Sequence, residues 1–131
     1  MTDLPDLAEI VPFAGVLGIE VVAAAPEEVH GRMPWKAEHC TMAGVLHGGS
    51  LMAFADTLGA TCAFLNLPEG ATTSTIESKT NFFRAVRGGV VTGVAKPLHV
   101  GRSFIVVQTQ LTDDEGRSVA LVTQTQAVLS T

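Results

Sequence analysis

The sequence has 131 residues, of which 47% are apolar and only 16% are charged. This length fits a single domain over residues 1–131 and is too short for two ordinary domains. The net charge of −5 argues against nucleic acid as a partner, and the large apolar fraction predicts a buried interface between copies of the chain.

The N-terminal segment and the two cysteines indicate the cellular setting. The first eleven residues, MTDLPDLAEIV, are acidic where a secretion signal would be basic, and no long apolar run is free of glycine, charge or polar clusters. Cys40 and Cys62 lack metal-ligand spacing, and a neighbouring His39 does not give Cys40 the geometry of a catalytic pair. We therefore expect a cytoplasmic protein with free thiols, no bound metal and no membrane contact.

The first third of the chain combines a helical and a β pattern. Asp3 as an N-cap, Pro5 in the first turn and the apolar spacing that follows favour a short helix that is broken near Pro12. Residues 19–35 then predict two strands joined by a turn at residues 26–28.

A loop and a long helix follow. Residues 36–46 have no clear period and are expected to form the loop. Apolar residues recur at helical spacing from Gly49 to about Asn66, and Pro68 and Gly70 end the pattern.

The remainder of the chain is β in character. Val107, Thr109 and Leu111 alternate with Gln108 and Gln110, as in a sheet with one covered face. Together with the earlier strands, this predicts an α+β fold in which about six antiparallel strands wrap around one long helix. The four predicted strand segments, separated by turn signals, are residues 72–86, 88–100, 102–112 and 117–129.

Two features of the long helix point to chemistry. Gly48 and Gly49 open it, and the first turn of a helix offers unpaired N–H groups that can hold an oxyanion. Asp56 follows among small and apolar residues with no cation in reach, where a carboxylate serves well as a base. The alternatives are glycines that only shape the loop and an aspartate that hydrogen-bonds within the core or faces water.

The spacing of these two features predicts a shared site. Gly48 and Asp56 are eight residues apart, which is roughly 12 Å along a helix. A base and an oxyanion donor must each lie about 3 Å from the reacting atoms, so one helix cannot supply both to the same carbonyl. Two antiparallel copies related by a two-fold axis can do so, which makes a homodimer the catalytic unit.

The segment AGVLHGGSLMAFADTLGA at residues 43–60 resembles the hotdog-fold acyl-CoA thioesterases, in particular the phenylacetate-pathway (PaaI-like) and 4-hydroxybenzoyl-CoA thioesterase-like branch. TIESKTNFFRAVRGG and LHVGRSFIVVQTQLTDDEGRSVA resemble later strands of that family, in the same order. The resemblance extends from about Val11 to Leu129.

The resemblance implies specific roles in catalysis. Asp56 would be the general base or nucleophile, and the N–H group of Gly48 in the opposite subunit would polarise the thioester carbonyl. Thr75 would help to position the attacking water. Thr41 stands where relatives carry Asn or Gln and reaches less far, whereas His47 matches a position that is more often structural than catalytic.

The resemblance also implies contacts with coenzyme A. Residues 78–112 contain five basic and no acidic residues, so they suit the anionic nucleotide end, although each arginine can equally be a plain surface residue. Phe82 and Phe83 would line an acyl pocket, with one of the two facing the core. The expected binding residues are Gly49, Asn81, Phe82, Arg84, Gly101, Arg102 and Ser103.

The implied reaction is hydrolysis of an aryl- or medium-chain acyl-CoA to the free acid and coenzyme A, with no cofactor beyond the coenzyme A of substrate and product. A non-catalytic acyl-CoA-binding protein and an acyl-thioester hydratase or dehydratase are the alternatives. The family implies a homodimer and further a homotetramer, for which we expect an exposed sheet face with Val107, Thr109 and Leu111.

Overall fold

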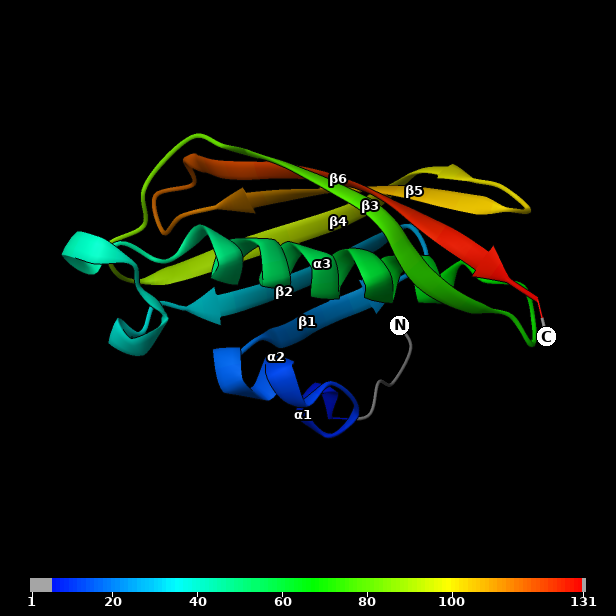
Figure 1. The fold of residues 1–131 in the computed structure, drawn as a ribbon, viewed down its shortest axis with the longest axis horizontal. Coiled ribbons are helices and arrows are strands. Elements are labelled where there is room, and N and C mark those ends of the chain that lie inside the picture. The colour runs from blue at the N-terminus through cyan, green and yellow to red at the C-terminus, as the bar shows by residue number, and fades with distance from the viewer. Residues whose placement is uncertain (1–5, 131) are drawn as a thin grey trace.

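A computed structural model describes residues 6–130 and contains one antiparallel sheet of six strands in the order β1-β2-β4-β5-β6-β3 (Figure 1). The sheet curves around one long helix, α3, which confirms the predicted α+β hotdog arrangement. The elements are α1 (Leu7–Ile10), α2 (Pro12–Leu17), β1 (Glu20–Ala25), β2 (Glu28–Pro34), α3 (Gly48–Leu65), β3 (Thr72–Phe82), β4 (Val90–Val100), β5 (Phe104–Thr112) and β6 (Ser118–Leu129).

The helix α3 packs closely on the sheet because two glycines make room for it. Leu51, Phe54 and Leu58 recur at helical spacing and are buried against the strands. Gly31 of β2 lies opposite Gly93 of β4, and a Cβ atom on either would lie 2.5 Å from a methyl carbon of Leu58. Any side chain at these two positions would therefore push the helix away from the sheet.

The prediction that Val107, Thr109 and Leu111 form an exposed face for tetramer formation is wrong. Val107, Thr109 and Leu111 are fully buried, because this side of β5 faces α3 and not the solvent. The alternation of side chains along a strand places Val106, Gln108 and Gln110 on the outer face instead.

The N-terminal helix also differs in detail. Asp3 and Pro5 lie outside the described residues, and α1 is capped by Asp6, whose carboxylate accepts a hydrogen bond of 3.1 Å from the N–H group of Ala8. The break near Pro12 is confirmed, and α2 begins there, since proline suits the first turn of a helix.

The predicted loop before α3 contains short helical turns. Residues 36–46 include two 3₁₀ turns, Ala37–His39 and Met42–Gly44. Such turns have no apolar period long enough to be read from the sequence.

Among the described residues, α3 is long and apolar enough to cross a membrane by length and composition alone. The helix lies against the curved sheet (Figure 1), and its buried apolar residues belong to the hydrophobic core. The apolar composition of α3 is therefore that of a core helix.

The thiol of Cys62 gives a measurable pH dependence of stability. This residue is fully buried on α3, and burial raises its pKa from the ordinary value of 9.0 to about 11. Folding keeps the thiol protonated, so its contribution to stability is complete below pH 9.0 and is lost as the pH rises toward about 11. We expect the free energy of unfolding to fall by about 2–3 kcal/mol over this range.

Urea denaturation at the two ends of this range measures the effect, with Cys62→Ala as the control. The variant lacks the buried thiol and should lose most of the pH slope. Equal slopes in both proteins would contradict the assignment. The same raised pKa makes Cys62 a poor nucleophile near neutral pH.

Candidate active site

Asp56 lies midway along α3 and is held by the two strands at one edge of the sheet. Its Oδ1 atom accepts hydrogen bonds of 3.2 Å from the hydroxyl of Thr75 on β3 and 3.2 Å from Nε2 of Gln124 on β6. Within residues 6–130, Asp56 forms no ion pair and its Oδ2 atom has no hydrogen-bond partner. One carboxylate oxygen is thus fixed, and the other is open to a ligand.

A chain of hydrogen bonds orients the hydroxyl of Thr75. Nε2 of Gln126 donates to Oγ1 of Thr75 at 2.7 Å, so the hydroxyl proton of Thr75 is directed to Asp56. The Oε1 atom of Gln126 lies 3.1 Å from the hydroxyl of Thr73, which can donate to it. Gln126 is completely buried, and a buried amide with both ends bonded holds a single orientation.

Gly59 leaves space for the second buried amide. A Cβ atom at Gly59 would lie 2.0 Å from Oε1 of Gln124, so only glycine lets this side chain pass under α3 to Asp56. Oε1 of Gln124 itself has no hydrogen-bond partner among the described residues. Within residues 6–130, the contact with Asp56 is therefore the one hydrogen bond that anchors this amide at the site.

Sequence reasoning found Thr75 but missed Gln124 and Gln126. Both alternate with Val122 on the face of β6 that covers α3. Two amides at buried positions of a predicted strand are a signal of a polar site, because such groups require partners.

The start of α3 forms the other half of the predicted site. His47 is the N-cap, and its Nδ1 atom accepts a hydrogen bond of 2.7 Å from the N–H group of Gly49. The N–H group of Gly48 donates to no other group in the described part of the chain. The N–H group that remains available is therefore that of Gly48, while His47 and Gly49 shape the helix start.

One copy of the chain does not assemble all the predicted residues. Gly48 and Asp56 remain eight residues apart on a continuous helix, roughly 12 Å along its axis. The end of β3 and the segment after it, which contain Asn81 and Arg84, lie at the end of the molecule where α3 begins (Figure 1). The hairpin that carries Gly101, Arg102 and Ser103 lies at the opposite end (Figure 1).

Thr41 and the two phenylalanines are exposed. Thr41 lies in the turn before α3, where its N–H group donates to the carbonyl of Val45 at 2.8 Å. Phe82 and Phe83 are 50% and 57% exposed, so the expectation that one of them faces the core is wrong. β3 is an edge strand, and the ring of Phe82 lies over Gly48 at the start of α3.

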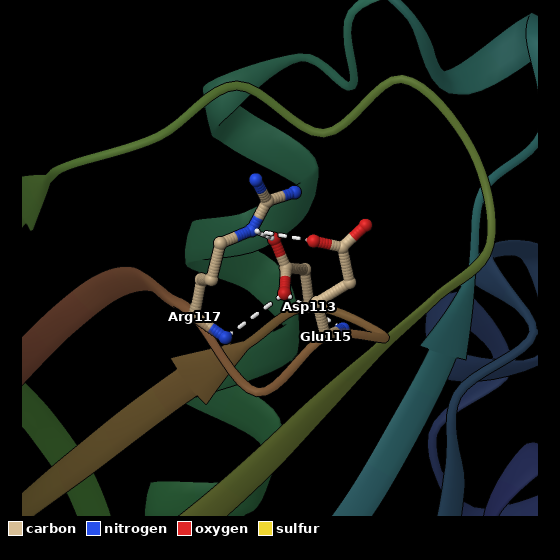
Figure 2. A network of polar contacts seen from close by, with 3 residues as sticks. All are labelled: Asp113, Glu115 and Arg117. Atoms are coloured by element: carbon tan, nitrogen blue, oxygen red, sulfur yellow. Dashed lines mark hydrogen bonds and ion pairs between the residues drawn. The ribbon is translucent and has the colours of Figure 1, made fainter.

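A polar hollow of about 520 Å³ lies beside the segment with Arg84 and Arg87. On its other side, the carboxylate of Asp113 accepts hydrogen bonds from the N–H groups of Glu115 and Arg117 and from Nε of Arg117 (Figure 2). Partial burial acts to raise the pKa of Asp113, but these bonds outweigh it and hold the pKa below its ordinary value. Arg117 is thus engaged, while Arg84 and Arg87 have no ion-pair partner within residues 6–130.

Comparisons with known proteins agree with this fold. Residues 43–120, more than half of the chain, match the model of the thioesterase superfamily. The sequence is 34% identical to the proofreading thioesterase EntH of Cronobacter turicensis over 101 residues, 77% of this chain and 74% of that protein.

Solved structures give the same picture. A thioesterase from Haemophilus influenzae superposes with a TM-score of 0.91 at 30% identity, covering 99% of this chain and 92% of that one. A mutant thioesterase from Pseudomonas aeruginosa superposes with a TM-score of 0.87 at 28% identity, covering 97% and 96%. The chain belongs to the thioesterase superfamily and is a thioester-hydrolysing enzyme with the hotdog fold.

Proposed function

We propose that the enzyme hydrolyses an aryl- or medium-chain acyl-CoA to the free acid and coenzyme A, in the cytoplasm and without a cofactor or metal. The observation that carries this proposal is the arrangement around Asp56. Its Oδ1 atom is fixed by Thr75 and Gln124, while Oδ2 is free to act on a substrate.

Two routes use this carboxylate. As a base, Asp56 takes a proton from water as the water oxygen bonds to the thioester carbon. The tetrahedral intermediate then collapses, the C–S bond breaks, and the thiolate leaves as coenzyme A after it takes up the proton. As a nucleophile, Oδ2 bonds to the carbonyl carbon and expels the thiolate, and water then cleaves the resulting anhydride.

An oxyanion forms on the carbonyl oxygen in both routes. The N–H group of Gly48 at the positive end of α3 is the proposed donor to it. Because Gly48 lies too far from Asp56 along the same helix, we propose that it comes from the partner subunit of a homodimer.

The edge strand β3 is the proposed site of pairing. It has eleven residues, of which only Thr73 and Thr80 are partly buried, and its outer edge has no neighbouring strand. A two-fold axis near Ser78 would place Glu77 opposite Lys79 of the partner subunit, twice by symmetry. These complementary charges favour antiparallel pairing in this register.

The same register completes the site. It sets Thr75, the neighbour of Asp56, opposite the strand end where Phe82 of the partner subunit covers the partner's Gly48. Within one chain, the hairpin between β4 and β5, which carries Arg102, lies at the end opposite the start of α3 (Figure 1), so antiparallel pairing would bring it toward the partner's end where α3 begins. The predicted coenzyme A contacts thus gather only in the dimer.

A homotetramer would use the outer face of the sheet. Val106, Gln108 and Thr123 lie there without charge, and Gln108 lies 3.3 Å from Thr123 in a hydrogen bond between β5 and β6. Two such faces can stack as sheets do in a sandwich, giving a dimer of dimers.

Charge reversal tests the pairing of β3. Glu77→Lys would bring like charges together twice across the two-fold axis, so we expect the dimer dissociation constant to rise about tenfold at low salt. The double variant Glu77→Lys with Lys79→Glu should restore the wild-type constant. Sedimentation equilibrium measures both, and an unchanged constant for the single variant would rule out this register.

Thiol release from a panel of aryl- and alkyl-acyl-CoA esters tests the function itself. Release by the wild-type enzyme would establish the substrate class. Saturable binding without release would select the acyl-CoA-binding alternative and draw attention to Thr41. Consumption of an enoyl-CoA without release of thiol would select the hydratase alternative.

A further inference from the structure

We infer that the groove between α1 and α3 binds the acyl group of the substrate and that this group is uncharged and apolar. The inference rests on the proposed function, because Asp56 forms part of the groove wall. The groove has a volume of about 780 Å³ and lies between the N-terminal segment and the middle of α3.

Apolar side chains from three elements form its walls. Ile10 of α1 and Phe64 of α3 are 60% and 61% exposed, although both line this concave surface. Large apolar side chains that remain exposed around a concave surface are typical of a ligand site. The apolar lining consists mainly of Leu7, Ile10, Val11, Val21, Ala60 and Phe64.

The hydroxyl groups in the groove have no proton to offer to a ligand. Thr57 donates to the carbonyl of Ala53 and Thr61 to that of Thr57, both at 2.7 Å within α3. The single hydroxyl proton of Thr73 is shared between two acceptors on β6, Oε1 of Gln126 at 3.1 Å and the carbonyl of Ala127 at 2.8 Å. A polar acyl tail would therefore lose its hydrogen bonds to water on entering the groove, and these side chains would donate none in their place.

The charges around the groove exclude an anionic tail. Among the described lining residues none is basic, whereas Asp6, Glu20 and Asp56 contribute carboxylates. Glu20 is paired with Arg32 at 3.1 Å, and Asp6 has no ion-pair partner within residues 6–130. An acyl group that ends in a carboxylate and the phosphates of coenzyme A would both be repelled. The acyl end of the substrate is thus the part that fits.

α1 forms one wall of the groove, and its position is fixed by close packing against α2. Gly15 lets the two helices approach, since a Cβ atom there would lie 2.9 Å from Cβ of Ala8. Ile10 is exposed and does not belong to the hydrophobic core, so its side chain can be changed without opening the core. Ile10 is therefore a suitable position at which to fill the groove.

Binding and turnover together test the inference. S-alkyl-CoA thioethers of two, six and ten carbons serve as uncleavable probes, and calorimetry gives their dissociation constants. If methylene groups enter the groove, affinity should rise by up to about fourfold for each one that is buried. Glutaryl-CoA should be hydrolysed at least about tenfold less efficiently than hexanoyl-CoA, since the carboxylate finds no partner.

Ile10→Trp should fill the groove and abolish the gain in affinity from two to ten carbons. The matched control is Val16→Trp, because Val16 is 61% exposed on α2 and does not line the groove. In this control variant, the affinity for the thioethers should rise with chain length as in the wild type. Circular dichroism and sedimentation on both variants verify fold and oligomeric state.

The outcomes separate the inference from the proposed function. If the affinity for the thioethers rises with chain length, Ile10→Trp abolishes this rise, and no thiol is released from acyl-CoA, the groove is supported as the acyl-binding site. Hydrolysis of acyl-CoA would then be refuted. The inference would be refuted if Asp56-dependent hydrolysis persists but the affinity for the thioethers does not rise with chain length in the wild type. It would also be refuted if Ile10→Trp leaves that rise in affinity unchanged. Loss of the dimer in Ile10→Trp alone would show that a second copy covers this surface, and would also overturn the inference.

Discussion

Asp56→Asn is expected to lower the turnover of the best acyl-CoA substrate by about 10²–10⁴-fold while the fold is retained. The amide has the size of the carboxylate, and its remaining oxygen can still accept hydrogen bonds from Thr75 and Gln124. What disappears is the open Oδ2 atom, because an amide nitrogen there neither accepts a proton nor attacks a carbonyl.

Steady-state kinetics of thiol release measure this loss, and thermal unfolding verifies the fold. Because the change removes a step in the reaction and no binding contact with coenzyme A, we expect the effect in kcat rather than in KM. Thr75→Val is a useful companion, since it deletes one donor to Asp56 but leaves the carboxylate. Turnover of Asp56→Asn within a factor of two of the wild type would remove Asp56 from the mechanism.

Gly48→Pro is expected to lower kcat by about 10²–10³-fold, as loss of one oxyanion donor does. Proline deletes the N–H group, yet Gly48 is the first residue of α3, where proline is tolerated. The preceding residue, His47, has φ −61° and ψ 134°, which suits a residue before proline. The substitution therefore removes the donor with little change to the helix.

Gly48→Ala is the matched control. Both variants place a Cβ atom 3.1 Å from the ring of Phe82, which is half exposed and can move aside. Alanine keeps the N–H group and should retain activity within a few-fold of the wild type. Equal losses in the two variants would show that crowding against Phe82, and not the N–H group, accounts for the effect.

Much of the fold could be predicted because its signals are local. The helical spacing from Gly49 to Asn66 and the valine- and threonine-rich segments gave elements close to the observed ones. The exposure of Phe82 and Phe83 depends on β3 being an edge strand, which no local pattern indicates. The two faces of β5 were assigned the wrong way round for the same reason. Alternation along a strand shows that its two faces differ, but it does not show which face packs against the helix.

The candidate site was predictable in part for a similar reason. Asp56 and Gly48 stand out within one helix, so their spacing could be interpreted directly. Gln124 reaches Asp56 across 68 positions of sequence, through the pairing of β6 with β3 and the space left at Gly59. The groove likewise depends on how α1 folds back beside α3, which the apolar residues of α1 alone do not indicate.

The most direct test of the shared site is complementation between Asp56→Asn and Gly48→Pro. In a mixed dimer, one of the two sites combines an intact Asp56 with an intact Gly48 from the other chain. After equal mixing and random exchange, verified by native mass spectrometry, thiol release should recover to about one quarter of the wild-type rate. If exchange is complete and activity remains at the level of the two parent variants, the two residues do not act together across a dimer interface.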